Sequence, residues 1–551
     1  MSDEIDFLGR FFTHEQPLGR IEAVEHISEQ DRTLFRKYFH QSNRPYEQIK
    51  RQPTMIVGRR GAGKTDALLA HEFIPQLSGR YDPLIYFEAA DAASLFQNIL
   101  FKINEQIRLD RPKPMVENVA ALWSRVFWTV IFQRLAASGA DGSKDQKTLS
   151  EFIRSQRISL SERNPYQTAF EALMALLKQS EAQESSAKSL GFFSQVDRLA
   201  DGPIGYLDAR EAAARILKSR TQKGIILLDS FETLDVTNEE SKLTISGLLR
   251  SVSRFHDEQI PVEVRCCIPA EAYFYVTEVS SNLLKDFERQ TVLHWNAMEI
   301  LQLCAKRYAA FIEIHYPAAQ NELVARYDLT TRPGTLAFWQ RLLPESVPNA
   351  SPDLREETIP YLLRHTQLLP RHMILLLNRC FSQHLSQGGK ITEPVADKLI
   401  TTVVRNTEGQ IADQIISAYK FIWPNARELV TAVFKELKHN VLGVGDLHRI
   451  FNRSGMRGLG NVYEFPDFLR MLTELGAVGR LIRKTEKYIV AAFEYSEPFR
   501  LLFNGDDDLC IHPCFTEMFR VISLGSIPSD YLPVYPLGAN LSDPDRRPLF
   551  D

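Results

Sequence analysis

Short apolar runs alternate with amphipathic segments along the first half of the chain. The runs are four to eight residues long and rich in Val, Ile and Leu, as in strands that are buried on both faces. They occupy residues 54–57, 83–88, 225–228, 261–268 and 290–295. Because helical patterns separate the runs, the sequence predicts a parallel α/β sheet.

Two further segments have the period of a helix. Hydrophobic residues from Val119 to Val130 recur at helical spacing, which predicts a largely helical insertion at about residues 100–220. Residues 366–379, TQLLPRHMILLLNR, form another apolar helix with Pro370 in its first turn, where proline is tolerated.

The C-terminal part shows three helical patterns followed by two strand patterns. The helices are predicted at residues 426–440, 445–451 and 464–475, and the strands at residues 478–482 and 488–495. This order describes a winged helix. Beyond it, a proline-rich stretch predicts an extended tail that packs on a surface or a partner.

The charge balance is nearly even, with 65 Lys and Arg against 69 Asp and Glu and a net charge of −4. Electrostatic binding of nucleic acid usually requires a basic excess, so any DNA contact must be a local patch. No apolar run reaches the ~18 residues of a membrane span. The acidic start, MSDEIDFLGRFF, lacks the pattern of a signal peptide, and we expect no association with membranes.

The six cysteines form no CxxC pair, which is typical of buried thiols in a reducing cytosol, so a cytoplasmic location is expected. Cys510, His512 and Cys514 have a spacing that a metal site can use. Alternation along a strand explains the same spacing without a metal, because no second pair of ligands accompanies them.

A phosphate-binding motif follows the first apolar run. The stretch GRRGAGKT fits GxxxxGK followed by Ser or Thr, and it lies between a strand pattern and a helix pattern. Its glycines let backbone N–H groups approach the phosphates, Lys64 reaches the β- and γ-phosphates, and Thr65 offers a hydroxyl to Mg²⁺. The residues predicted to hold ATP here are Gly58, Arg59, Arg60, Gly61, Ala62, Gly63, Lys64, Thr65 and Asp66.

The acid that completes the Mg²⁺ site is predicted at the end of the third run. Four consecutive apolar residues end at Asp229, which would hold Mg²⁺ through water. Glu232 follows three positions later. It is either the base that orients the attacking water or an acid on the surface of a loop.

The stretch LLDSFETL, residues 227–234, resembles the second nucleotide motif of the NACHT and KAP branches of the STAND ATPases, relatives of the AAA+ ATPases. The resemblance implies ATP hydrolysis with Asp229 and Glu232 as catalytic residues. Thr233 stands where a second distal acid is usual, which leaves the turnover rate open. In these families a polar sensor follows the fourth strand, where Arg265 and Glu271 are candidates.

Two arginines match other positions of the resemblance. Arg289 directly precedes the fifth run, the location of an AAA+ arginine finger that reaches the γ-phosphate of a neighbouring subunit, although a solvated arginine is the simpler explanation. Pro370 and Arg371 resemble the helical lid of AAA+, STAND and origin-recognition ATPases, whose arginine meets the γ-phosphate at a helix N-terminus.

The resemblance implies five segments: a helical N-terminal segment, a P-loop core with its helical insertion, a helical lid, a winged helix and an extended tail. Their bounds are 1–48, 49–295, 296–404, 405–515 and 516–551. The whole is expected to be an ATPase that acts as a conformational switch, with slow hydrolysis and within a homo-oligomer.

The 48 residues before the core and the tail after the winged helix are too short for an effector domain, so a separately encoded effector partner is expected. Comparable bacterial ATPases regulate anti-phage defence, an analogy at the level of the fold.

The alternative function is an ATP-dependent DNA loader or transposition-type regulator that binds duplex DNA with its wing. A scaffold that binds nucleotide without turnover is a third possibility. The wing is basic, through Arg480, Arg483, Lys484 and Lys487. The preceding helix carries Glu464, Asp467 and Glu474, which oppose DNA.

Overall fold

The computed structural model describes most of the chain in two compact units. The described residues are 9–20, 49, 53–73, 81–82, 89–109, 115–137, 143–156, 158, 165–183, 204–229, 235, 238–257, 260–279, 289–349, 351–454, 463–496, 501–516 and 531–541. The first unit is essentially Tyr46–Leu293, and the second is His294–Asp551 with residues of the N-terminal segment.

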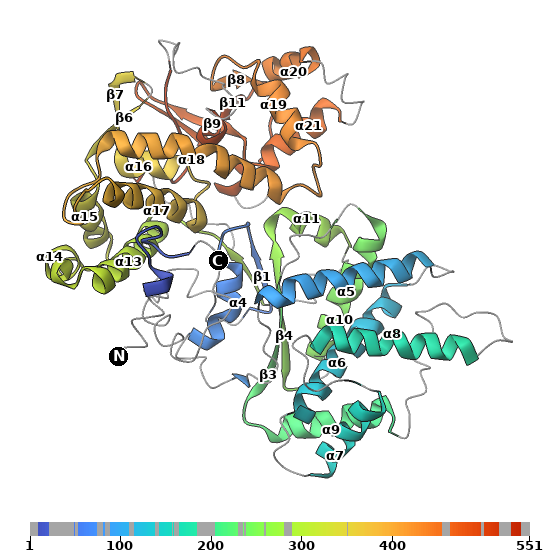
Figure 1. The fold of residues 1–551 in the computed structure, drawn as a ribbon. Helices are drawn as coiled ribbons and strands as arrows, with labels where there is room; N and C mark the ends of the chain where they lie inside the picture. The colour runs from blue at the N-terminus through green and yellow to red at the C-terminus, as the bar shows by residue number, and fades with distance from the viewer. Residues whose placement is uncertain are drawn as a thin grey trace. The chain divides into compact units, whose positions relative to one another are not determined.

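A parallel sheet of five strands forms the centre of the first unit, which confirms the predicted α/β core (Figure 1). Its strands are β1 (Met55–Gly58), β2 (Tyr81–Asp82), β3 (Lys223–Leu228), β4 (Val262–Pro269) and β5 (Gln290–Leu293), in the order β2-β3-β4-β1-β5. All described pairs of neighbouring strands are parallel. The run predicted at residues 83–88 lies outside the described residues.

Helices cover both faces of this sheet, with α4 on one side and α5, α6 and α10 on the other (Figure 1). Their bounds are α4 (Lys64–Phe73), α5 (Ala89–Leu109), α6 (Val116–Ala137), α10 (Glu239–Asp257) and α11 (Ala270–Val279). The remaining insertion helices are α7 (Lys144–Ser155), α8 (Pro165–Gln183) and α9 (Tyr206–Ser219).

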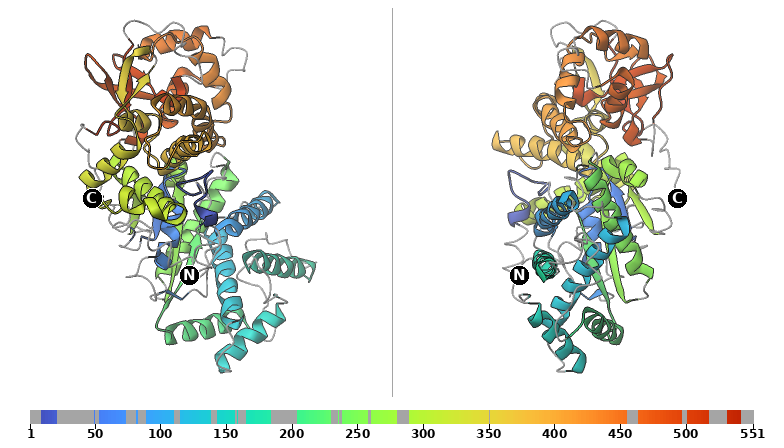
Figure 2. Two further views of the ribbon diagram at one scale, coloured as in Figure 1. Left: turned by 60° about the vertical axis from the view of Figure 1, so that its left-hand side comes forward. Right: turned by 90° about the vertical axis from the view of Figure 1, so that its right-hand side faces the viewer.

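Helix α6 is the core of the insertion. It is buried on nearly all sides from Val119 to Ala136, as expected of a helix that is apolar all round. Trp128 stacks on Phe255 of α10, with ring centroids 5.4 Å apart. Both views of Figure 2 show the insertion helices, in blue to teal, beside and below the sheet. The predicted helical insertion is therefore present as a packed part of the first unit.

The second unit begins with a helical part. Its elements are α13 (Ala297–His315), η4 (Pro317–Ala319), α14 (Gln320–Leu323), α15 (Arg332–Leu342), the hairpin β6 (Ser346–Asn349) and β7 (Ser351–Glu357), α16 (Thr358–Arg364), α17 (Pro370–Ser386) and α18 (Asp397–Ala418). Helix α17 starts at Pro370, in the first turn as predicted. Helix α18 runs through residue 404, so the predicted boundary between lid and winged helix falls inside one helix.

A second sheet of five strands follows, in the order β12-β10-β9-β11-β8. Its elements are α19 (Ala426–Phe434), β8 (Val441–Gly443), α20 (Val444–Arg453), α21 (Phe465–Glu474), β9 (Val478–Lys484), β10 (Ile489–Ala492), η6 (Glu494–Ser496), β11 (Asp508–Ile511), α22 (Pro513–Thr516) and β12 (Val534–Pro536). The predicted helix at residues 426–440 ends at Phe434, before β8. Figure 2 shows the strands of this sheet, in orange and red, at the end of the unit away from α13.

The described residues near the two ends of the chain pack into the second unit. In the N-terminal segment, residues 12–20 form bends and turns instead of a helix, with Pro17 and a left-handed Gly19 (φ 79°). Phe11, Phe12 and Leu18 are buried in the core of the second unit. In the predicted tail, β12 pairs in parallel with β10, so the compact unit continues past residue 515.

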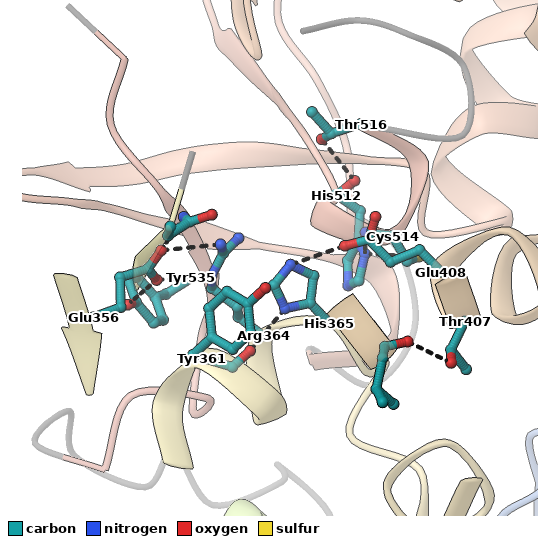
Figure 3. A network of polar contacts seen from close by, with 12 residues as sticks. Glu356, Tyr361, Arg364, His365, Thr407, Glu408, His512, Cys514, Thr516 and Tyr535 are labelled. Atoms are coloured by element: carbon teal, nitrogen blue, oxygen red, sulfur yellow. Dashed lines mark hydrogen bonds and ion pairs between the residues drawn. The ribbon is translucent and has the colours of Figure 1, made fainter. Parts of the chain in front are cut away.

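A buried polar network lies inside the second unit (Figure 3). Arg364 donates from Nε to Glu356 Oε2 at 2.8 Å and from Nη2 to Glu356 Oε1 at 3.1 Å, and both side chains are 3% exposed. The hydroxyl of Tyr535, in β12, also donates to Glu356. Beside this pair, His365 Nε2 lies 3.0 Å from Glu408 Oε1 of α18. These buried groups connect the helical part to the C-terminal strand.

Candidate functional site

The predicted phosphate loop joins the buried strand β1 to helix α4. Gly61 and Gly63 adopt left-handed backbone conformations, with φ of 92° and 88°, which other residues rarely adopt. A Cβ on Gly58 would lie 3.2 Å from Lys64 Cγ and 3.3 Å from Leu293 Cβ, tighter than ordinary contact. The glycines of the motif are therefore required by the backbone path, and they turn the chain into the N-terminus of α4.

Lys64 lies inside the loop at the start of α4. Its residue is 5% exposed, and its ammonium donates to Arg59 O at 3.3 Å. Cys267 of β4 contacts Lys64 O through Sγ at 3.4 Å, which links α4 to the sheet. The loop thus combines a positive charge, backbone N–H groups and a helix N-terminus at the carboxyl end of a parallel strand, where phosphates bind in such sheets.

The acid and the hydroxyl predicted to hold Mg²⁺ meet in the structure. Thr65 Oγ1 donates to Asp229 Oδ2 at 2.6 Å, although the two residues are 164 positions apart. Asp229 directly follows β3, and β4 lies between β3 and β1 in the sheet. All three strands end at the same edge because they are parallel.

The donor set fits Mg²⁺. A carboxylate and a hydroxyl are hard oxygen ligands, and Mg²⁺ usually takes only one or two protein groups and completes its shell with water and phosphate oxygens. Over the described residues, no group of three or more His, Cys, Asp or Glu is arranged to hold a metal ion by itself. A bound nucleotide would therefore have to supply part of the shell. The predicted base Glu232 lies outside the described residues.

The two candidate sensor residues on β4 and α11 have different surroundings. Arg265 lies within β4, is 1% exposed and donates to Glu263 at 2.6 Å, so it lies inside the strand and not at its end. Glu271 lies in the first turn of α11, and its Oε1 accepts a hydrogen bond from Arg60 N of the phosphate loop at 2.9 Å. The structure therefore brings Glu271, but not Arg265, to the loop.

Arg289 lies at the opposite end of the strands, where β1 and β5 begin. Its carbonyl accepts hydrogen bonds from Thr54 N and Met55 N at 2.8 and 3.3 Å, where β1 begins. Its guanidinium lies 3.4 Å from Glu263 within the same chain. In this chain Arg289 therefore does not contribute to the phosphate loop, and a role toward a neighbouring subunit stays a prediction.

The predicted lid arginine belongs to the second unit. Pro370 is at the first turn of α17 and Arg371 follows it, half-buried, at the helix N-terminus. The preceding Leu368 has a φ of 49°, the one left-handed non-glycine residue among those described. The side chain of Gln367 donates to Leu475 O at 2.8 Å, so the turn before Arg371 is fixed to the end of α21. Contact with a γ-phosphate stays a prediction.

The predicted wing is the hairpin of β9 and β10. Arg480 donates to Leu502 O at 3.4 Å, while Arg483 and Lys484 are exposed together with the apolar Ile482. In the preceding helix α21, Glu474 is held inside the unit by Trp423 Nε1 at 2.7 Å and Arg470 Nε at 2.7 Å. Part of the acidic charge of this helix is therefore already neutralised.

Cys510, His512 and Cys514, whose spacing a metal site could use, lie in the buried core of the second unit. Cys510 lies in β11 and Cys514 in α22, and His512 Nδ1 lies 3.0 Å from Cys514 Sγ in the buried core. Burial raises the pKa of the Cys510 thiol to about 12.

Of the helices that the structure describes, none has the length and apolar composition needed to cross a membrane.

Comparison with known proteins adds little to this geometry. No protein-family model matches the chain, and no curated protein matches it. Among solved structures, the chain is similar to the Aeropyrum pernix ORC2 protein in its ADPNP-ADP complexes, with 12% identity and a TM-score of 0.30 over 64% of this chain and 82% of that chain. A likeness at this TM-score supports no inference about the chain.

Proposed function

We propose that this chain is a P-loop ATPase that binds ATP with Mg²⁺ and hydrolyses it slowly as a conformational switch. The observation that supports this most directly is the 2.6 Å hydrogen bond between Thr65 Oγ1 and Asp229 Oδ2. It joins the last residue of the phosphate motif to the acid after β3, the pair expected to share one Mg²⁺ ion.

The residues of the site would then have distinct roles. The N–H groups of the loop and the Lys64 ammonium hold the phosphates, while Thr65 and Asp229 orient the metal. Mg²⁺, when bound, neutralises phosphate charge and orients the phosphate oxygens. Glu232 would orient the attacking water, the role expected of an acid close behind Asp229.

A switch of the STAND or AAA+ type is the reading that fits the rest of the chain best. The strand order β2-β3-β4-β1-β5 matches the core of these ATPases, in which one strand separates the phosphate-loop strand from the acid-bearing strand. In the second unit, α19, β8, α20, α21, β9 and β10 follow one another in the order of a winged helix. In this reading Arg371 reports the γ-phosphate, and the output is a change in oligomeric state or in affinity for a separate effector protein.

The second candidate is an ATP-dependent DNA loader. The exposed basic side chains of β9 favour it, since they could contact a phosphate backbone without reading sequence. The acids Glu464 and Asp467 at the start of α21 oppose it, because the first turns of such a helix usually face the bases. We therefore prefer the switch.

The test is calorimetric titration of ATP and Mg²⁺ into the wild type, Lys64→Ala and Asp229→Asn. The wild type should bind ATP, and Lys64→Ala should abolish binding, because it removes the charge that faces the β- and γ-phosphates. Asp229→Asn should retain ATP binding but lose most of its dependence on Mg²⁺. An ATP affinity that is the same in the wild type and Lys64→Ala would overturn the assignment of the site.

A further inference from the structure

The carboxylate of Glu271 lies at the phosphate loop, although the function proposed above gives it no task. Glu271 is in the first turn of α11, which begins where β4 ends. The last residue of β4, Pro269, pairs with Gly58, the last residue of β1. The chain therefore leaves β4 beside the loop that follows β1, and it brings Glu271 to the edge of the sheet where nucleotide is expected.

The contact of Glu271 uses one of the N–H groups of the loop. Its Oε1 accepts from Arg60 N at 2.9 Å. Its Oε2 is buried and has no hydrogen-bond partner within the described part of the chain. The hydrogen bond from the loop to Oε1 therefore holds the Glu271 carboxylate in place, while Oε2 is buried without a donor.

A bound triphosphate would compete with this carboxylate. Phosphate loops bind through their backbone N–H groups, and a triphosphate brings several negative charges to them. Asp229 is also an acid at this edge, but it is expected to share a Mg²⁺ ion with the phosphates. Glu271 bonds the loop directly, so a nucleotide meets it as a like charge that already occupies a donor.

We propose that Glu271 is an internal competitor for phosphate: its carboxylate holds the Arg60 N–H in the nucleotide-free protein, and nucleotide binding displaces it. The inference rests on the proposed nucleotide site and gives that site a regulatory residue. Displacement breaks the hydrogen bond between the loop and the first turn of α11. The occupancy of the loop is thereby transmitted to α11, and the affinity for nucleotide is set below what the loop alone would provide.

The test compares ATP affinity in Glu271→Gln with that in the wild type, both with Mg²⁺. Glutamine keeps the size and an acceptor oxygen but has no charge, so ATP should bind about tenfold more tightly, equivalent to about 1.4 kcal/mol. Glu271→Ala, which also removes the acceptor, should bind at least as tightly. The matched control is Glu105→Gln in α5, which removes the same charge from an exposed position and should leave the affinity unchanged.

The outcomes separate this inference from the function on which it rests. If wild type and variants bind no nucleotide, the proposed site itself is wrong. If the wild type binds and Glu271→Gln binds equally or more weakly, Glu271 does not compete with phosphate. A slower turnover at unchanged affinity would instead make it a residue that acts on the attacking water, which also overturns the proposal. Glu271→Asp keeps the charge on a shorter side chain and reports on the reach of the carboxylate if the glutamine variant is unstable.

Discussion

The buried pair of Glu408 and His365 (Figure 3) predicts a pH dependence of stability that Glu408→Gln should remove. The hydrogen bond of His365 to the backbone fixes one of the protons. His365 Nδ1 lies 2.8 Å from Tyr361 O, which can only accept, so Nδ1 carries a proton. Nε2 lies 3.0 Å from Glu408 Oε1. A neutral ring accepts there from a protonated Glu408, whereas a charged ring donates there to an ionised Glu408. The environment of the pair decides between these two states.

The environment of the pair favours a protonated Glu408 and a neutral His365. Burial raises the pKa of Glu408 from 4.5 to about 8, although the charges of Arg364 and Arg405 act in the opposite direction. Burial, together with Arg364, holds the pKa of His365 well below 6.5. Glu408 Oε2 has no hydrogen-bond partner among the described residues, which is less costly for an acid than for a carboxylate. In the folded protein Glu408 thus keeps its proton up to about pH 8.

The direction of the effect follows from comparison with the unfolded chain. The raised pKa of Glu408 stabilises the fold fully below about pH 4.5, and this stabilisation is lost as the pH rises toward 8. The lowered pKa of His365 stabilises the fold above about pH 6.5, and this is lost as the pH falls. Between pH 4.5 and 6.5 the two effects cancel. From pH 6.5 to 8 only the loss from Glu408 remains, about 1.5 pH units or about 2 kcal/mol.

The assay is thermal unfolding of the second unit at pH 6.5 and pH 8.5, in the wild type and Glu408→Gln. The glutamine amide can donate to His365 Nε2 and has no proton to lose. When the pH rises from 6.5 to 8.5, the Tm of the wild type should therefore fall by about 4–8 °C more than the Tm of the variant. Glu393→Gln, at an exposed position, is the matched control and should follow the wild type. Equal pH dependence in Glu408→Gln and the wild type would refute the assignment of a protonated Glu408.

Three further predictions concern the proposed switch. Glu232→Gln should retain ATP binding but slow phosphate release at least ~100-fold, the usual effect of losing a positioned base; unchanged release would make Glu232 a surface acid. Arg371→Ala should bind ATP but lose any ATP-dependent change in oligomeric state, measured by light scattering. The third prediction concerns the wing, where charge reversal should leave ATP turnover intact, and the wild type should bind duplex DNA weakly or not at all at ~150 mM salt. Tight, ATP-dependent duplex binding that the reversal abolishes would favour the DNA loader. The four residues reversed to Glu are Arg480, Arg483, Lys484 and Lys487.

The core of the site was predictable because its signals are local. A strand pattern, a glycine turn and a helix pattern follow one another without interruption around Lys64, and Asp229 ends a run of four apolar residues. Parallel strands bring such ends together whatever the length of chain between them, so the contact of Thr65 with Asp229 follows from the pattern. The same local reasoning places Arg371 at a helix N-terminus, because Pro370 marks the start of α17.

The N-terminal segment and the tail were harder, because tertiary contacts decide their structure. Residues 12–20 are held in turns by the second unit: the side chain of Asn378 accepts from Leu18 N at 2.6 Å and donates to Gly19 O at 3.0 Å. The strand β12 exists because it pairs with β10, and proline content alone predicts only that the segment is extended. Neither contact has a signature in the local sequence.

Glu271 and Glu408 illustrate two kinds of polar residue that pattern reasoning treats differently. Glu408 lies in the stripe of α18 that contains the buried apolar residues Val404, Ile411 and Ile415. That interruption is a signal in the sequence, since an acid in such a stripe needs a buried partner, but the sequence does not name His365 as that partner. Glu271 has no such signal, because an acid in the first turn of a helix is favourable by itself. Its contact with Arg60 N appears only when β1 and β4 are placed side by side. A carboxylate that local rules explain completely can therefore still lie where it opposes a ligand, and only the fold reveals the conflict.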